Sequence, residues 1–232
     1  IKELSEDGTV AFDGCSYSVT EISRITHLAF KAAQNSRKKI TLVDKANVLE
    51  TSRLWRKTVT EIAKEYKDVT LEFLFVDNAA MQMILNPKQF DVILTENLFG
   101  DIISDEASVI GGSIGLLASS SIGEKNALFE PIHGSFPQAT GKDIANPLAS
   151  ILSAAMLLEH LGLHDEAEAV ENAVEKSLEL SIVTEDLNSE KSFSTSKVGD
   201  FIADYIEHPD DSNHNFQNIH MGSSRSIFLY SK

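Results

Sequence analysis

Two aspartates four residues apart, Asp101 and Asp105, offer the clearest chemistry in this sequence. On a helix this spacing places both carboxylates on one face, where they repel each other unless a cation lies between them. Hard divalent cations such as Mg²⁺ prefer carboxylate oxygens. A solvated acidic helix start explains the same pair without a ligand, because the helix dipole favours carboxylates there. Spacing alone leaves both interpretations open.

Two other charged residues, Lys45 and Asp77, each follow a predicted strand, as Asp101 does. The carboxyl ends of strands are where open α/β sheets bind ligands. A lysine at such a place could donate or accept a proton, although an ordinary surface lysine is the plainer explanation. Three such residues in register suggest a shared cleft.

A long loop over residues 130–146 is the third candidate feature. Loops of this length are uncommon and are usually functional or disordered. Its backbone N–H groups could hold a nucleotide, but the chain contains no G-x-G-x-x-G, so a Rossmann site is not supported. Asn146 and Pro147 then predict a helix start, with Asn as the N-cap and Pro at the first helical position.

Short apolar runs alternate with helical patterns, which predicts an α/β sandwich. The first helix is expected to start near residue 19, because Ser18 and Glu21 have capping-box spacing. Strands are predicted at 9–12, 40–43, 71–76, 91–94 and 127–129, and helices at 52–66, 78–85, 100–109, 167–178 and 198–205. Residues 208–232 are predicted to form a weakly ordered tail, because they are rich in His, Asn, Ser and Asp.

Composition narrows the class of partner. The net charge of −15 argues against nucleic acid and anionic membranes, which would repel the chain, and favours a small-molecule substrate. Cys15 is the only cysteine, so no intrachain disulfide can form and a cytoplasmic location is expected. The sequence shows neither a secretory signal nor an apolar run long enough to span a membrane.

Three ordered motifs resemble the β-decarboxylating dehydrogenases. They are residues 44–50 with 54–57, residues 97–105, and residues 130–147. Lys45-Ala46-Asn47 and the Leu-Trp-Arg at 54–56 look like the 3-isopropylmalate branch, since isocitrate and homoisocitrate enzymes usually carry Gly or Ser in place of Ala46. The resemblance runs from about residue 1 to 206 and covers the carboxy-terminal two-thirds of the family pattern.

This resemblance implies a two-domain, non-Rossmann α/β sandwich of the isocitrate/isopropylmalate dehydrogenase type, with the amino-terminal part of the cofactor domain absent. Residues 1–111 would form the substrate, metal and dimerisation domain, incomplete at its start, and residues 112–207 the carboxy-terminal half of the cofactor domain. The active sites would be shared within a homodimer. Asp101 and Asp105 match the metal ligands from one subunit, and Asp77 matches the metal ligand that the partner supplies. Lys45 matches the partner's catalytic lysine, beside which Asp77 is also given a catalytic role. The residues that match cofactor contacts are Asn47, His133, Gly134, Ser135 and Asn146.

The implied reaction is NAD-dependent oxidative decarboxylation of 3-isopropylmalate to 2-oxoisocaproate, a step of leucine biosynthesis, assisted by Mg²⁺ or Mn²⁺. Gln138 stands where the family often has an Asp that selects NAD; Gln does not repel a 2′-phosphate, so NAD over NADP is an expectation. The substrate-binding arginines and the catalytic tyrosine have no counterpart here. Two alternatives remain: a related enzyme acting on tartrate or homoisocitrate, and an incomplete dimerising fragment without turnover.

Overall fold

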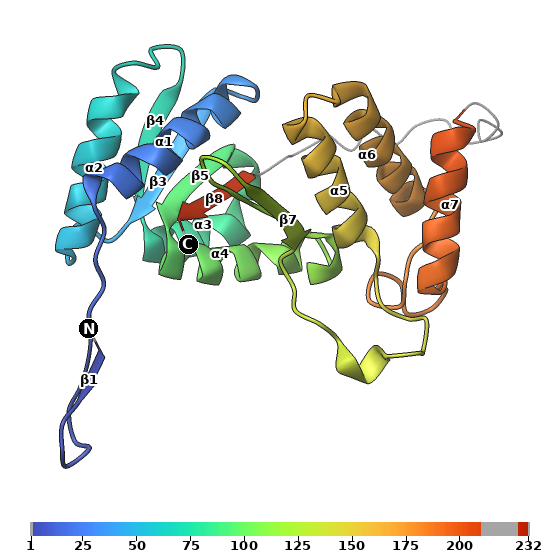
Figure 1. Ribbon diagram of the computed structural model, residues 1–232, viewed down its shortest axis with the longest axis horizontal. Coiled ribbons are helices and arrows are strands. Elements are labelled where there is room, and N and C mark those ends of the chain that lie inside the picture. Colours follow the sequence, from blue (N-terminus) through green and yellow to red (C-terminus); the bar gives the residue numbers. More distant parts are fainter. Residues whose placement is uncertain (1, 210–226, 232) are drawn as a thin grey trace. The chain divides into compact units, whose positions relative to one another are not determined.

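The computed structural model describes residues 2–209 and 227–231 (Figure 1). The chain divides into two compact units, one of Ile1–Glu106 with Gly222–Lys232 and the other of Ala107–Met221. The division falls inside a helix, a few residues before the boundary expected at 111. Among the described residues, no helix is both long enough and apolar enough to cross a membrane.

The first unit is built on a four-stranded sheet in the order β4-β3-β5-β8, in which every neighbouring pair is parallel. Its strands are β3 (Lys39–Asp44), β4 (Thr70–Phe75), β5 (Val92–Glu96) and β8 (Ile227–Ser231). Its helices are α1 (Val19–Gln34), α2 (Glu50–Ala63), α3 (Val76–Leu85) and α4 (Asn97–Ile110), with α4 running past the unit's end at Glu106. A parallel sheet with helices on both faces buries its central strands, and β5 is buried along its whole length.

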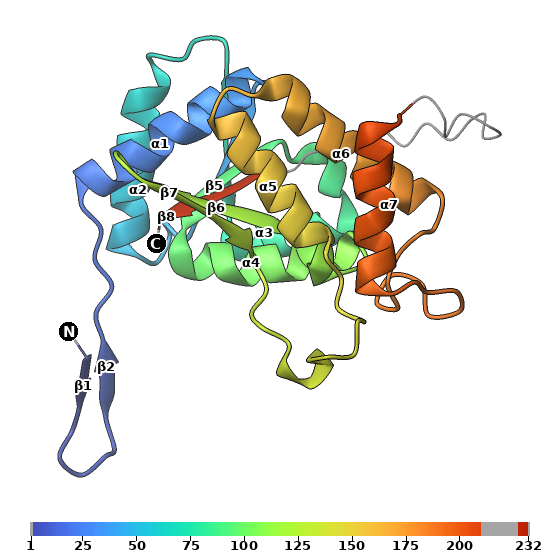
Figure 2. The ribbon, with the colours of Figure 1, turned by 45° about the vertical axis from the view of Figure 1, so that its right-hand side comes forward.

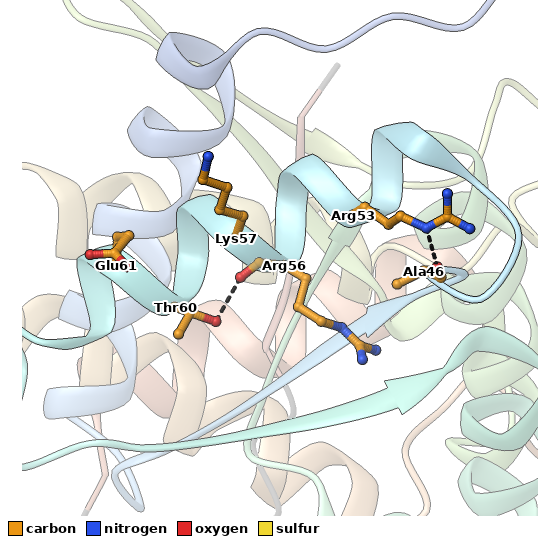
Figure 3. A pocket seen from close by; sticks show the side chains of 6 residues that line it. All are labelled: Ala46, Arg53, Arg56, Lys57, Thr60 and Glu61. Carbon is orange, nitrogen blue, oxygen red and sulfur yellow. Dashed lines mark hydrogen bonds between the residues drawn. The ribbon is translucent and has the colours of Figure 1, made fainter.

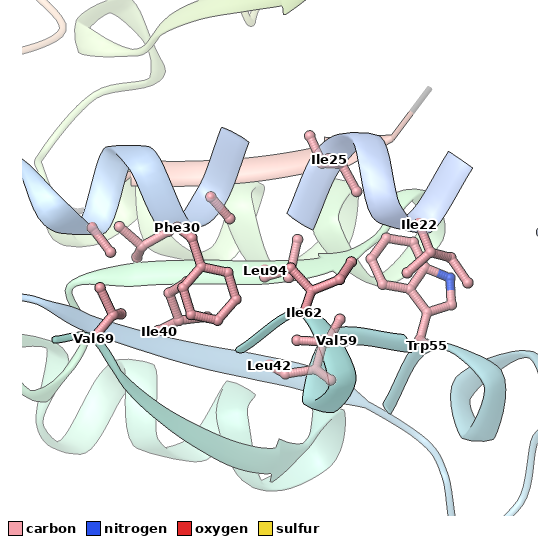
Figure 4. Packing of buried hydrophobic residues seen from close by; sticks show 13 residues of the cluster. Ile22, Ile25, Phe30, Ile40, Leu42, Trp55, Val59, Ile62, Val69 and Leu94 are labelled. Atoms are coloured by element: carbon pink, nitrogen blue, oxygen red, sulfur yellow. The ribbon is translucent and has the colours of Figure 1, made fainter. Parts of the chain in front are cut away.

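Helices α1 and α2 cover one face of this sheet (Figure 4). Alternate residues of β3 and β5 point toward them, because side chains of a strand alternate between its two faces. The cluster includes the fully buried Phe30 and Trp55, each of which stabilises the fold by roughly 2–3 kcal/mol through burial. Helix α4 lies on the opposite face of the sheet from α1, as both ribbon views show (Figure 1, Figure 2). The sheet therefore holds the starts of α2, α3 and α4 near its carboxyl edge.

An antiparallel hairpin precedes α1. It consists of β1 (Lys2–Leu4) and β2 (Ala11–Asp13), whose residues are all exposed. Figure 2 shows it extending away from α1. The apolar side chains of Leu4, Val10 and Phe12 are exposed on it. A lone two-stranded hairpin is only marginally stable in water, so these side chains suit a surface that something else covers.

The second unit packs helices against a two-stranded antiparallel sheet. Its elements are β6 (Ala118–Ile122), β7 (Ala127–Pro131), α5 (Leu148–His160), α6 (His164–Glu179) and α7 (Thr195–Glu207), with short 3-10 turns η2 (Ile114–Leu116) and η3 (Pro137–Ala139). Apolar residues of α5, α6 and α7 form its core, including Leu148, Val174 and Ile202.

Most predicted elements are confirmed, and the structure differs from the sequence analysis in the three places described next. Strand β6 was missed because its serine-rich sequence reads as a loop. Helix α5 begins at Leu148, one residue later than predicted, although Asn146 Oδ1 does accept a hydrogen bond from its first N–H. Strand β8 at Ile227–Ser231 lies within the segment predicted from 208 as a weakly ordered tail; residues 210–226 lie outside the described part of the chain.

Candidate active site

Lys45 and Asp77 meet at the carboxyl edge of the sheet. Lys45 directly follows β3, and Asp77 lies in the first turn of α3, directly after the neighbouring strand β4. The two strands are parallel and in register, which brings their ends together. The Lys45 ammonium donates a hydrogen bond to the Asp77 carboxylate, and this bond lowers the pKa of Asp77 below its ordinary value. The structure thus brings two of the three strand-end residues into contact, and the cleft shared with Asp101 stays a prediction.

Asp101 and Asp105 both lie on α4, one helical turn apart, and both are exposed. Asn97 donates from Nδ2 to Asp101 at 3.4 Å, which orients that carboxylate. Within the part of the chain that the structure describes, no three His, Cys, Asp or Glu side chains converge as a metal site requires. The donor set of hard carboxylate oxygens suits Mg²⁺ or Mn²⁺, but one copy of this chain supplies only two of the three proposed ligands at one place.

An ion pair that the sequence did not reveal lies directly behind Lys45. Asp44, the last residue of β3, is only 2% exposed, and Arg56 of α2 holds it through Nε and Nη2, each 2.8 Å from a carboxylate oxygen. The Asp44 carboxylate also accepts the Ala46 N–H at 3.0 Å. The Arg56 guanidinium lies over the ring of Phe73, 4.9 Å from its centroid. Asp44 therefore fixes the turn that carries Lys45. The pairing with Arg56 had no sequence signal, because the two residues are twelve positions apart.

Glu96, the last residue of β5, is a second buried carboxyl at this edge and is 5% exposed. It lies beside Asp44 because Val43 and Thr95 pair across the two strands. Burial, together with the neighbouring charge of Asp44, raises the pKa of Glu96 above its ordinary value. Its Oε2 atom has no hydrogen-bond partner among the described residues. Folding thus makes the Glu96 carboxyl harder to ionise than an exposed glutamate.

Asn47 lies in the turn after Lys45. Arg53 of α2 binds the backbone of this turn. Arg53 donates from Nε to the Ala46 carbonyl at 2.9 Å and from Nη2 to the Asn47 carbonyl at 3.5 Å. Beside this turn is an open hollow of about 340 Å³ (Figure 3). Its lining residues are Ala46, Arg53, Arg56, Lys57, Thr60 and Glu61. Because Arg53 and Arg56 are already paired with acidic groups, the hollow is less cationic than its composition suggests.

The proposed cofactor contacts of the second unit lie along residues 133–146, which we call the nucleotide loop. His133 Nδ1 contacts the Gly134 carbonyl at 3.0 Å, while its Nε2 atom is buried without a partner among the described residues. A buried polar atom of this kind is one that a bound ligand or a water molecule would satisfy. Gly134 and Ser135 are exposed, and a Cβ added at Gly134 would meet nothing within 4 Å. The loop is therefore open to a ligand at its beginning.

Asn146 ends the nucleotide loop, and its side chain is engaged within the protein. Its Nδ2 donates to Asp186 at 2.9 Å, and its Oδ1 accepts the Leu148 N–H at 2.9 Å. The sequence did not indicate that Asp186 binds Asn146, because Asp186 lies forty positions later in an ordinary acidic loop. Asn47 and the nucleotide loop belong to different units, so only their local surroundings bear on the proposed cofactor role.

Comparisons with known proteins show the family of the chain. The sequence pattern of the family described as isocitrate/isopropylmalate dehydrogenase matches residues 1–202. The chain is 55% identical over 203 residues to a 3-isopropylmalate dehydrogenase of Wolinella succinogenes, covering 86% of this chain and 57% of the relative. It is 58% identical over 200 residues to a 3-isopropylmalate dehydrogenase of Clostridium pasteurianum, covering 84% of this chain and 56% of the relative. The chain thus spans little more than half the length of these relatives.

Solved structures show the same fold. An isocitrate dehydrogenase from Methylococcus capsulatus matches with a TM-score of 0.85 at 40% identity, over 90% of this chain and 63% of that one. The apo form of a β-decarboxylating dehydrogenase from Thermococcus kodakarensis matches with a TM-score of 0.81 at 36% identity, over 94% of this chain and 64% of that one. The α/β fold predicted from the motifs is confirmed, and the chain belongs to the isocitrate/isopropylmalate dehydrogenase family.

Proposed function

We propose that this chain is part of an oxidoreductase that converts 3-isopropylmalate to 2-oxoisocaproate with NAD and Mg²⁺ or Mn²⁺, a step of leucine biosynthesis. The observation that carries the proposal is the identity of 55–58% with curated 3-isopropylmalate dehydrogenases, over a match that contains Lys45, Asp77, Asp101 and Asp105. We also propose a cytoplasmic location, in keeping with a single cysteine.

The residues of the site divide the work of the proposed reaction. Asp101 and Asp105 would hold a divalent cation. When bound, that cation would polarise the oxygen atoms of the substrate, and NAD would accept the hydride. Lys45, once it has released its own proton, would take the substrate's hydroxyl proton, directly or through a water molecule. The Asp77 carboxylate then stabilises the ammonium that results, since an opposite charge in contact favours the charged form.

We propose that the active form is a homodimer in which Asp77 and Lys45 of one copy complete the metal site of the other. The single copy leaves that site incomplete among its described residues. Leu98 and Ile102 are exposed apolar residues, each three positions before one of the proposed metal ligands, and so lie beside them on α4. The neighbouring helix α3 exposes Met81, Ile84 and Leu85. Large exposed apolar patches mark association surfaces, which supports an interface around α3 and α4.

The nucleotide loop supports a dinucleotide role in the second unit. Its partnerless His133 Nε2 and its exposed Gly134 backbone suit a ligand that offers hydrogen bonds and needs close backbone approach. The choice of NAD over NADP rests on the family resemblance and not on Gln138, which carries no charge to repel a 2′-phosphate. NADP therefore belongs in the test as a separate arm.

The experiment is NADH formation by the purified 232-residue chain with 3-isopropylmalate, NAD and Mn²⁺, beside Asp101→Asn and the exposed control Glu65→Gln. We expect turnover only with Asp101 intact. If the chain is silent, the same assay on a chain extended upstream to the full length of its relatives distinguishes the two explanations. Activity of the longer chain means that the missing segment is required. Silence there, or faster turnover of tartrate or homoisocitrate, would overturn the proposal.

A further inference from the structure

The carboxylate of Asp186 gathers hydrogen bonds from three separate segments of the second unit. Thr184 donates from its hydroxyl at 2.5 Å, and Asn146 donates from Nδ2 at 2.9 Å. The Ser113 hydroxyl donates to the same carboxylate oxygen as Asn146. Asp186 therefore joins the turn before η2, the end of the nucleotide loop and its own turn.

The contact between Asn146 and η2 is close enough to fix the loop's position. Ser113 caps η2 by accepting the Gly115 N–H at 2.9 Å while its own hydroxyl proton goes to Asp186. A Cβ added at Gly115 would lie 2.8 Å from Asn146 Cβ, a separation that real Cβ contacts essentially never show. With Oδ1 also bound to the first N–H of α5, Asn146 has no freedom to rotate.

A second acidic residue, Asp143, lies in the loop itself and binds residues at the start of α7. Asp143 accepts the Ser196 N–H at 2.9 Å and the Ser196 hydroxyl at 2.8 Å. Thr195 donates its N–H to the Asp143 carbonyl at 2.9 Å and its hydroxyl to the Ala145 carbonyl at 2.5 Å. Residues 143–146 are thus held by the segment 184–196, whereas His133 has only its contact with the adjacent Gly134.

We propose that Asp186 is a positioning residue for the nucleotide loop: by holding Asn146 against η2, it fixes the loop's end in the geometry that a bound dinucleotide requires. This inference rests on the proposed function and adds a residue that does not itself touch the cofactor. Preorganised loops bind more tightly because less ordering is left for the ligand to impose. Asp186 acts through Asn146, whose side chain links Asp186 to the first N–H of α5.

The negative charge of Asp186 is central to this arrangement. Burial acts to raise its pKa, yet the bonds from Ser113, Thr184 and Asn146 together lower the pKa below its ordinary value, so the carboxylate is ionised near neutral pH. Hydrogen bonds to ionised acceptors are stronger than those to neutral ones. Replacing the carboxylate by an amide would remove this charge and could turn a donor toward Asn146 Nδ2, which is itself a donor.

The first test is amide hydrogen exchange on the purified 232-residue chain, comparing Asp186→Asn with Glu185→Gln, the exposed neighbouring acid. We expect exchange at Leu148 and Gly115 to become roughly three- to tenfold faster in Asp186→Asn, because the acceptors of those N–H groups lose their anchor. Exchange in β3 and β5 of the other unit should not change. Equal exchange at Leu148 and Gly115 in the two variants would overturn the positioning role.

The second test disturbs Asn146 from Gly115 instead of from Asp186, and it adds NADH as the ligand. Gly115→Ala should reproduce the faster exchange at Leu148 with Asp186 intact, because the added Cβ would displace Asn146. Unchanged exchange at Leu148 would contradict the proposed role of Asn146. In NADH titrations followed by fluorescence, both variants should raise Kd roughly three- to tenfold while Mn²⁺ affinity stays that of wild type. If neither the parent chain nor a chain extended upstream to the length of its relatives binds NADH, although exchange responds as expected, the loop anchor stands and its cofactor role is overturned. If NADH binds equally to all variants, the positioning inference alone fails.

Discussion

Arg56 holds Asp44 with a paired contact, in which Nε and Nη2 each lie 2.8 Å from one of the two carboxylate oxygens. Such bidentate pairs are stronger and more directional than single contacts. Asp44 is the residue before Lys45 and also binds the Ala46 N–H. The position of the proposed catalytic lysine therefore depends on Arg56, a residue of α2 that holds the preceding residue.

Arg56→Ala should lower the free energy of unfolding by about 3 kcal/mol, because it leaves the buried Asp44 carboxylate without its cation. Urea denaturation followed by circular dichroism measures this. The matched control is Lys57→Ala, an exposed residue on the same helix turn, whose effect should stay within about 0.5 kcal/mol. Similar losses in both variants would mean that Arg56 contributes no more than a surface residue.

Lys45→Met should raise the pKa of Asp77, because the variant removes the hydrogen bond that lowers it. A carboxyl whose pKa is lower in the folded state stabilises the fold above its unfolded pKa, and this contribution is lost as pH falls through the folded pKa. NMR titration of the Asp77 side-chain carboxyl carbon reports the shift without any substrate, with Lys57→Met as the control. An unchanged Asp77 titration would show that the contact does not form in solution.

Glu96→Gln should stabilise the protein at pH 8 by on the order of 1 kcal/mol, since it removes a buried charge without a partner. The pKa of Glu96 is raised by burial and by Asp44, so the folded state retains a proton that the unfolded state has released. Stability contributed by this group is therefore lost as pH rises from the unfolded to the folded pKa. Unfolding measured across that range should lose this pH dependence in Glu96→Gln but keep it in Glu65→Gln. A loss of stability at pH 8 would mean that Glu96 has a charged partner.

Removing residues 208–232 should expose the edge of β5, which pairs with β8 along its full length. Unpaired strand edges exchange faster and promote aggregation. We expect amide exchange at Val92–Glu96 to increase at least tenfold, with more light scattering at the same concentration. Phe228→Pro and Leu229→Pro form a matched pair, because N–H groups of successive strand residues point to opposite sides and only one faces β5. Equal protection of β5 in the truncated chain would show that β8 does not pair in solution.

The sequence predicted features set by local pattern and missed those set by tertiary contact. Ser18 and Glu21 form the predicted capping box, and the strand-end positions correctly indicated that Lys45 and Asp77 lie close together. Periodicity also placed Asp101 and Asp105 on one helix. Their metal-binding role stays a prediction, as do the cofactor contacts, because no ligand geometry follows from a single chain.

The partnerships of Arg56 and Asp186 could not be predicted from spacing. Arg56 meets Asp44 only because α2 packs on β3, and Asp186 meets Asn146 only because residues 184–186 return to the loop. Glu96 resembles any polar residue at a strand end until packing buries it. Strand β8 was missed because its register is set by β5, at the other end of the chain, and because the polar composition of the preceding segment favoured disorder.

The pairing of β5 with β8 also bears on how the protein acquires its structure. Residues 227–231 lie beyond the family match, which ends at 202, and are synthesised long after β5. The pairing of β5 with β8 joins segments far apart in the sequence and so raises the contact order, which slows folding. The edge of β5 stays open until residues 227–231 have been synthesised, and transiently open edges are where nascent chains associate wrongly. Chaperone dependence during translation should therefore exceed that of a chain whose sheet closes early.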